Sequence, residues 1–290
     1  MKQAKILRWH CRDRSVELGE RTLVMGILNV TPDSFSDGGR FFDGRQAVEH
    51  GLRMAQDGAD LIDVGGESTR PGSESVSPEE ELRRIGPVIE ALARETKCLV
   101  SVDTRKAGVA EKALALGAHI INDVSALTSD PAMPAVAARH GAGLVLMHMR
   151  GEPKTMQADP RYGDVVSEVA AYLGARLADL GRQGLRPEAM AVDPGIGFGK
   201  TAEHNVSLLA HLDALAALGR PVVVGVSRKS FLGKITGREV GDRLAGSLGA
   251  AAYAVLRGAH VIRVHDVKES CDVARLVDIF KREEPRDVRV

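Results

Sequence analysis

The chain repeats one pattern eight times: a short, nearly continuous apolar run followed by a longer segment with helical periodicity. Runs that are apolar throughout, and not only at alternate positions, are typical of strands covered on both faces, as in a parallel sheet. The runs are residues 23–28, 61–64, 99–103, 119–122, 143–149, 190–193, 222–226 and 261–264. Helices are expected at residues 45–57, 78–95, 106–116, 132–140, 162–183, 203–218, 241–257 and 267–282.

A glycine-alanine pair ends four of the expected helices directly before a strand begins. The pairs are Gly58-Ala59, Gly117-Ala118, Gly141-Ala142 and Gly258-Ala259. Glycine readily takes the left-handed conformation that ends a helix. Eight such units in 290 residues predict an α/β fold, a closed (β/α)8 TIM barrel forming one domain over residues 1–290. A dinucleotide-binding sheet is disfavoured, because no G-x-G-x-x-G follows the first strand.

Two kinds of segment lie outside this repeat. Residues 6–20 precede the first barrel strand and are expected to form a short N-terminal hairpin. The connections over residues 29–45 and 150–162 are long for a compact domain, and such loops are usually functional.

Composition narrows the class of partner and the compartment. The 39 basic and 39 acidic residues cancel, which argues against nucleic acid or an anionic membrane as the main partner. The three cysteines lack metal-ligand spacing, and Cys98 opens an apolar run as a small buried residue would. This cysteine usage suggests a reducing compartment. No secretory signal and no stretch of about 20 apolar residues is visible, so we expect a cytoplasmic protein.

Polar residues gather where the apolar runs end. In barrels of this kind the carboxyl ends of the strands and the loops after them form the active site. A buried, unpaired charge is costly, so such groups persist when they pair with each other or with a ligand. Any one of them is explained about equally well by an ordinary salt bridge. Their occurrence at seven strand ends together predicts a ligand site.

One part of this predicted site is cationic. Strands eight, one and two are consecutive around a closed barrel, so their polar ends form an anion-accepting arc of Asn29, Arg70, Arg263 and His265. The fork of donors on arginine suits phosphate oxygens. Mg²⁺ typically binds such phosphates and takes only one or two oxygens from the protein.

The opposite part offers two carboxylates, an amide and an ammonium group, from Asp103, Asp193, Asn122 and Lys229. Such a set addresses the donor and acceptor edge of a flat, neutral heterocycle. A carboxylate, expected here to be Asp193, accepts hydrogen bonds from a ring N–H and its neighbouring amino group. The sequence therefore predicts a polar heterocycle joined to a phosphate or pyrophosphate.

Some features allow two interpretations. The glycines of residues 195–199 suit a phosphate loop, but a tight turn is favoured. His148 is at least as well explained as a core histidine as a catalytic one. Phe35 is either a hydrophobic latch or a substrate contact. Glu79, Glu80 and Glu81 follow Pro78 as in an ordinary helix start.

Seven segments resemble, in order, the motifs of dihydropteroate synthases, from about Met25 to Val267. The first two are Met25-Gly26-Ile27-Leu28-Asn29-Val30-Thr31-Pro32-Asp33-Ser34-Phe35-Ser36-Asp37-Gly38-Gly39 and Asp63-Val64-Gly65-Gly66-Glu67-Ser68-Thr69-Arg70-Pro71-Gly72. The others are Ser101-Val102-Asp103-Thr104, Asn122-Asp123-Val124-Ser125, Asp193-Pro194-Gly195-Ile196-Gly197-Phe198, Ser227-Arg228-Lys229-Ser230-Phe231 and Arg263-Val264-His265-Asp266.

The resemblance implies a folate-biosynthetic transferase that uses Mg²⁺. Such an enzyme joins 6-hydroxymethyl-7,8-dihydropterin pyrophosphate to p-aminobenzoate, giving 7,8-dihydropteroate and pyrophosphate. By that likeness, the pterin lies against Asp103, Asn122, Asp193 and Lys229, and the pyrophosphate and metal lie near Asn29, Arg70, Arg263 and His265. The p-aminobenzoate pocket is formed by Phe35, Asp37, Thr69, Arg70, Pro71 and Ser230. Sulfonamides would compete there, and family members are usually homodimers.

A mechanism follows from this chemistry. The aniline nitrogen is already neutral at pH 7, so no strong base is needed, and departure of pyrophosphate is the difficult step. We expect an SN1-like path in which Asn29, Asp103, Lys229, Arg263 and His265 act as catalytic residues and Asn29 also holds the metal. Whether Asp33 or Asp37 joins it stays open.

Three alternatives remain at this point. A pterin-binding barrel that presents methyltetrahydrofolate to a corrinoid protein would not need the two glycine-rich loops. A non-catalytic paralogue would bind pterin or a partner protein without turnover. A phosphate-binding aldolase would need a Schiff-base lysine inside a strand, and Lys229 lies at a strand end.

Overall fold

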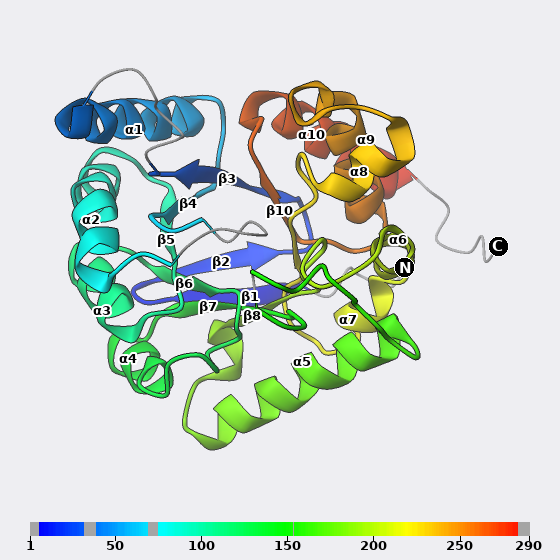
Figure 1. The fold of residues 1–290 in the computed structure, drawn as a ribbon, viewed down its shortest axis with the longest axis horizontal. Coiled ribbons are helices and arrows are strands. Elements are labelled where there is room, and N and C mark those ends of the chain that lie inside the picture. The colour runs from blue at the N-terminus through cyan, green and yellow to red at the C-terminus, as the bar shows by residue number, and fades with distance from the viewer. Residues whose placement is uncertain (1–5, 32–38, 69–74, 153, 284–290) are drawn as a thin grey trace.

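The computed structural model describes residues 6–31, 39–68, 75–152 and 154–283, with the backbone alone described for residues 39–43. Figure 1 shows helices arranged around a central set of strands. Within the described residues, no helix is both long enough and apolar enough to cross a membrane.

Eight parallel strands form the barrel. They are β3 (Leu23–Asn29), β4 (Leu61–Gly65), β5 (Leu99–Asp103), β6 (Ile120–Asp123), β7 (Gly143–Met147), β8 (Met190–Asp193), β9 (Val223–Val224) and β10 (Val261–Val264). Their order is β8-β7-β6-β5-β4-β3-β10-β9, and a parallel bridge from Val192 to Val222 joins the two edges. The predicted (β/α)8 barrel is therefore confirmed. Strand β9 is shorter than its apolar run, because only two residues make regular pairs.

The surrounding helices also follow the predicted pattern. They are α1 (Gly39–Gln56), α2 (Pro78–Glu95), α3 (Ala107–Ala115), α4 (Met133–His140), α5 (Val165–Arg182), α6 (Ala202–Ala210), α7 (Asp213–Ala216), α8 (Ser230–Thr236), α9 (Leu244–Leu256) and α10 (Val267–Glu283). Two details differ from the prediction. The helix expected over residues 203–218 is two helices, with α6 ending at Ala210 before the cap residue His211, and α8 was not predicted.

The four glycine-alanine signals act as expected. Gly58, Gly117, Gly141 and Gly258 have φ values of 103°, 110°, 60° and 105°. Side chains rarely adopt this region, so glycine at each position lets the helix stop and the next strand begin at once.

The predicted hairpin closes the amino-terminal end of the barrel. Strands β1 (Leu7–Cys11) and β2 (Arg14–Leu18) pair antiparallel and lie within the ring of helices (Figure 1). The Trp9 indole N–H donates to the Ala189 carbonyl oxygen at 2.9 Å. Trp9 packs with Leu61 and Leu99 in an inner apolar cluster, so side chains fill the base of the barrel.

Residue alternation then determines what lies above this base. Leu61 belongs to the inner cluster and Ile62 to the outer core between sheet and helices. Successive strand side chains point to opposite faces, so Asp63 faces inward again, one layer nearer the carboxyl end. The same step leads from Val261 to Arg263 on β10. The barrel interior is thus apolar at its base and polar toward its carboxyl end.

Candidate active site

A cavity opens at the carboxyl ends of the strands. Its lining includes residues from five strands or their following loops, namely Asp103, Asn122, Asp193, Lys229 and Arg263. These residues are far apart in sequence, and the sequence analysis expected them to share one site. The structure brings all five together.

Arg263 and two carboxylates lie together at this cavity, where Arg263 and Asp103 line it and Asp63 is buried behind them. Arg263 Nε donates to Asp63 Oδ2 at 2.6 Å, and Arg263 Nη2 donates to Asp103 Oδ2 at 2.8 Å. Asn122 Nδ2 also donates to Asp63 Oδ2, at 2.8 Å. We call Asp63, Asp103, Asn122, Asp193 and Arg263 the floor cluster. It places Arg263 beside the acids, whereas the sequence analysis grouped Arg263 with the anion-accepting arc.

Asp63 was missed as a site residue. The other predicted site residues lie at or after the ends of apolar runs, whereas Asp63 lies inside a run. A usable signal was present, because Asp63 follows the inward-facing Leu61 by two positions and must face the same way.

Burial governs the charges of the floor cluster. It raises the pKa of Asp103 to about 7; the Arg263 cation opposes the rise and the neighbouring Asp63 adds to it. Burial also raises the pKa of Asp193, against a hydrogen bond from the Gly195 N–H and the charge of Lys229. Carboxylates exceed cations here, so the floor suits a ligand that supplies N–H donors or develops positive charge.

A strained turn presents Lys229 to the cavity. Arg228 has φ of 56°, a left-handed value uncommon outside glycine, and its guanidinium is 2.5 Å from Asp266. The Lys229 ammonium then lies over the Phe198 ring, 4.2 Å from its centroid. Ser230 is exposed at the first position of α8. The turn thereby directs Lys229 toward the acids and Ser230 toward solvent.

Two members of the expected anion-accepting arc lie at neighbouring strand ends. Asn29 ends β3, and His265 follows the adjacent strand β10 with its Nδ1 3.0 Å from Ser227 Oγ. Gly65 pairs with Asn29 on one side and Asp103 on the other. A Cβ on Gly65 would lie 3.8 Å from Asn29 Oδ1 and 3.7 Å from Asp103 Oδ2. Gly65 thus lies between the polar side chains of Asn29 and Asp103.

The remaining predicted site residues lie outside the described part of the chain. These are Phe35, Asp37, Thr69, Arg70 and Pro71, together with Asp33 as a possible metal ligand.

The glycine-rich segment after β8 is a tight turn, as favoured. Gly195, Gly197 and Gly199 all have positive φ, and a Cβ on Gly195 would overlap the His148 carbonyl oxygen. His148 is buried, with Nδ1 3.0 Å from Lys200 Nζ, and burial together with that cation lowers its pKa to about 3. These contacts give His148 the core role rather than a catalytic one.

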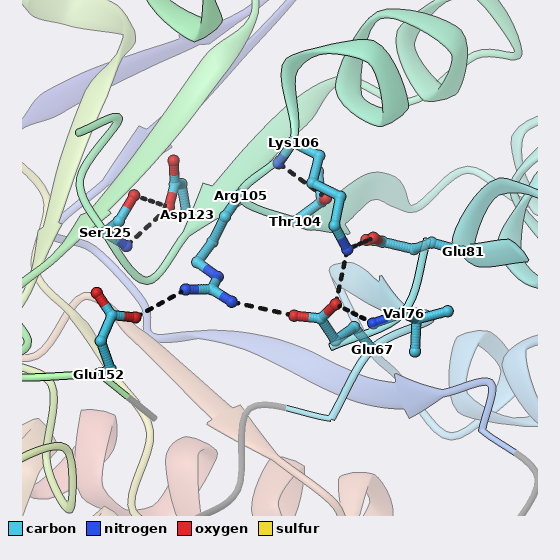
Figure 2. A network of polar contacts seen from close by, with 9 residues as sticks. All are labelled: Glu67, Val76, Glu81, Thr104, Arg105, Lys106, Asp123, Ser125 and Glu152. Atoms are coloured by element: carbon cyan, nitrogen blue, oxygen red, sulfur yellow. Dashed lines mark hydrogen bonds and ion pairs between the residues drawn. The ribbon is translucent and has the colours of Figure 1, made fainter. Parts of the chain in front are cut away.

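A second polar network joins the loops at the rim (Figure 2). Glu67 accepts from Lys106 Nζ at 2.6 Å, from the Val76 N–H at 2.8 Å and from Arg105 Nη2 at 3.2 Å. Lys106 Nζ is also 2.5 Å from Glu81 Oε2, and Arg105 Nη1 is 3.5 Å from Glu152 Oε2. We call Glu67, Glu81, Arg105, Lys106 and Glu152 the rim network.

The rim network adds a role to one residue of the expected helix start. Ser77 caps α2 by accepting from the Glu80 N–H, and Pro78 begins the helix, as expected of an ordinary start. Glu81, however, is only 1% exposed and bonds to Lys106. It therefore lies in the first turn of α2, as expected, and also joins that helix to Lys106.

The predicted magnesium can be tested against the donor atoms present. Within the described residues, no three acids, histidines or cysteines converge on a common point. The Asn29 amide oxygen at the edge of the cavity is a suitable single ligand for a hard cation. The donors that the structure describes fit a Mg²⁺ ion held mainly by substrate phosphates, and by themselves they do not form a cage around it.

Known proteins resemble this chain in both sequence and structure. Residues 25–265 match the family model described as pterin binding enzyme. The dihydropteroate synthase of Escherichia coli (strain K12) is 49% identical over 255 residues, which cover 88% of this chain and 90% of the relative. That of a Synechocystis species is 47% identical over 266 residues, which cover 91% of this chain and 92% of the relative.

The chain belongs to the dihydropteroate synthase family. Like the other members of this family, it is a transferase that joins dihydropterin pyrophosphate to p-aminobenzoate. The synthase from Xanthomonas albilineans with 4-aminobenzoic acid has a TM-score of 0.90 and 46% identity, covering 97% of this chain and 100% of that one. The methyltetrahydrofolate-binding alternative is not supported by these matches.

Proposed function

We propose that Asp103, Asn122, Asp193 and Lys229 bind the pterin ring of the first substrate. The observation that carries this proposal is the shared cavity of Asp103, Asn122, Asp193 and Lys229, which come from three strands and the turn after a fourth. Buried carboxylates accept N–H donors of the ring, and the surplus of negative charge favours the cation formed as pyrophosphate leaves. A dihydropteroate synthase from Xanthomonas albilineans was solved with 7,8-dihydropteroate, at 45% identity and a TM-score of 0.86.

The leaving pyrophosphate is assigned to Asn29, Arg70, Arg263 and His265. Asn29 and His265 lie at adjacent strand ends on one edge of the barrel. Arg263 connects the two parts, because its guanidinium contacts Asp63 and Asp103 on the floor. Bound Mg²⁺, held by Asn29 and the phosphates, would neutralise negative charge on the leaving group. The protein's own cations hold the anion while the pterin carbon becomes electron-poor, as in an SN1-like path.

The p-aminobenzoate pocket is assigned to Phe35, Asp37, Thr69, Arg70, Pro71 and Ser230. Ser230 is the described member, exposed beside Lys229. The Yersinia pestis synthase was solved in complex with a sulfonamide drug, at 42% identity and a TM-score of 0.89. We expect sulfonamides to compete with p-aminobenzoate here as well.

We further propose a homodimer and a cytoplasmic location. Helices α9 and α10 lie side by side (Figure 1) and expose Leu256, Leu276, Ile279 and Phe280, whose exposed fractions are 46%, 53%, 52% and 58%. A cluster of exposed apolar side chains of this kind suits a contact between two copies of the chain. Light scattering after gel filtration should give twice the monomer mass of 31.0 kDa, and Phe280→Glu should give the monomer. A monomeric wild-type protein would reject the dimer.

The activity is tested by a coupled assay of pyrophosphate release. Purified protein is supplied with both substrates, with and without Mg²⁺, and dihydropteroate is measured alongside. We expect formation of both products in equal amounts, dependent on p-aminobenzoate and strongly reduced after chelation of the metal. Absence of dihydropteroate under all conditions would contradict the activity, while full rates without metal would remove only the Mg²⁺ assignment.

A further inference from the structure

We propose that Asp63 positions Asn122 and Arg263 and thereby sets the hydrogen-bonding pattern that the cavity shows to the pterin ring. This inference deepens the proposed pterin site and rests on it. Asp63 is completely buried and is not among the residues that line the cavity, so it acts through its neighbours.

The geometry places one carboxylate oxygen between two site residues. Asp63 Oδ2 accepts from Asn122 Nδ2 at 2.8 Å and from Arg263 Nε at 2.6 Å. Asn122 comes from β6 and Arg263 from β10, while Asp63 lies on β4. A single atom thus orients side chains that the backbone brings from two other strands.

This contact decides which end of the Asn122 amide is available to a ligand. An ionised carboxylate can only accept hydrogen bonds, so the NH₂ group of Asn122 must face Asp63. The amide oxygen is then the end left for the cavity that Asn122 lines. Without Asp63 the amide could turn round, and it would offer donors where a ring edge rich in N–H groups needs an acceptor.

The same contact fixes the plane of the Arg263 guanidinium. Its Nε is bound to Asp63 and its Nη2 to Asp103, which lies on the neighbouring strand β5. Two charge-assisted hydrogen bonds to two strands leave the planar fork little freedom. Asp63 therefore determines where the cation stands relative to the ring.

Two substitutions separate this role from packing. Asp63→Leu keeps the size of the side chain and removes the acceptor, whereas Asp63→Asn keeps an acceptor oxygen and removes the charge. Ser101→Ala is the matched control, because Ser101 is the registered partner of Asp63 on β5, is equally buried and has an unpaired hydroxyl. The readouts are the Kd of 6-hydroxymethyl-7,8-dihydropterin by calorimetry and the KM values of both substrates.

We expect Asp63→Leu to weaken pterin binding by about 30-fold or more, because buried donors on Asn122 and Arg263 lose their partner. The Kd of the pterin should stay within about 5-fold of wild type in Asp63→Asn and within about 2-fold in Ser101→Ala. The KM of p-aminobenzoate should change least. Pterin binding of Asp63→Leu equal to that of Ser101→Ala would overturn the inference while leaving the proposed function intact.

A second variant tests the same inference if Asp63→Leu does not fold. Asn122→Asp sets two carboxylates against each other without a donor between them, so pterin binding should fall by about 10-fold or more. Unchanged binding in Asn122→Asp would equally overturn the inference. A wild-type protein that binds no pterin would instead overturn the proposed function itself.

Discussion

The floor cluster and the rim network both pair acids with bases above the same barrel, but their electrostatics are opposite. In the floor cluster, burial dominates and raises the pKa of Asp103 to about 7. In the rim network, burial also raises the pKa of Glu67, but hydrogen bonds from Lys106 and the Val76 N–H outweigh it and lower the pKa overall. The folded protein therefore favours ionised Glu67 and disfavours ionised Asp103.

This difference separates a structural network from a functional one. Glu67 has three donors, each from a different residue, and gains from folding. In the floor cluster, burial instead raises the pKa of Asp103 and Asp193, and Asp63 keeps a buried oxygen without a partner, as Glu81 does in the rim network. Such an arrangement costs stability unless a ligand supplies the missing donors. We infer that the rim network stabilises the loops and the floor cluster is maintained for binding.

The largest expected effect is on catalysis, from Arg263→Lys in the floor cluster. Lysine retains the positive charge but cannot contact Asp63 and Asp103 through a rigid fork. We expect kcat to fall by about 100- to 1000-fold, with a smaller change in the KM for the pterin substrate. Steady-state kinetics with both substrates measures this. A kcat within about 3-fold of wild type would show that the fork has no catalytic role.

Next in size is the loss of stability from Glu67→Ala in the rim network. The substitution removes an acceptor from Lys106, Arg105 and the Val76 N–H and leaves Lys106 with Glu81 and Arg105 with Glu152. The free energy of unfolding should therefore fall by about 2–3 kcal/mol. Urea denaturation measures it. Glu17→Ala breaks the exposed pair with Arg8 and is the control, with an expected cost below about 0.5 kcal/mol. If the two substitutions lowered the free energy of unfolding equally, the rim network would stabilise the protein no more than an exposed ion pair does.

The two clusters should also respond to pH in opposite directions. The pKa of Asp103 is raised from 3.8 to about 7, so its contribution to stability is full below its unfolded pKa and is lost as pH rises toward 7. The pKa of Glu67 is lowered, so its contribution is present above its unfolded pKa and is lost as pH falls through the folded value. The stability of Asp103→Asn relative to wild type should therefore rise between about pH 4 and pH 7 and level off above that.

The matching experiment on the rim uses Glu67→Gln. Its deficit relative to wild type should be constant near neutral pH and should shrink on acidification below about pH 4. Urea denaturation of both variants across this range measures both trends. The same pH slope in Asp103→Asn and wild type would mean that Asp103 is not responsible.

The smallest effect is expected from Glu152→Ala, at the outer end of the rim network. The Glu152 side chain is 75% exposed and its oxygen lies 3.5 Å from Arg105. The free energy of unfolding should change by less than about 0.5 kcal/mol. A larger loss would show that the network extends to the surface in energetic terms.

Much of the fold was predictable because it depends on local patterns. Apolar runs and glycine caps placed the eight barrel strands and most of the helices to within a few residues. Helix α8 was not predicted, because it is only seven residues long and begins directly after Lys229. The division between α6 and α7 was not predicted either, because the helical spacing of apolar residues continues across His211.

The site was predictable only in part, because pairing between distant side chains leaves no mark in the sequence. The convergence of Asp103, Asn122, Asp193, Lys229 and Arg263 followed from their positions on strands. The contact of Lys106 with Glu81, 25 positions apart, did not, because an acid at a helix start has an ordinary explanation. Asp63 was also predictable, because side chains alternate between the two faces of β4 and Asp63 follows the inward-facing Leu61 by two positions.

The account is tested most directly by a crystal structure of this chain with 7,8-dihydropteroate bound. We predict that ring N–H groups lie within hydrogen-bonding distance, about 3 Å, of an Asp193 carboxylate oxygen and of the Asn122 amide oxygen. The Asn122 NH₂ group should still donate to Asp63. A ring bound away from these residues, or an Asn122 amide turned with its oxygen toward Asp63, would contradict the account.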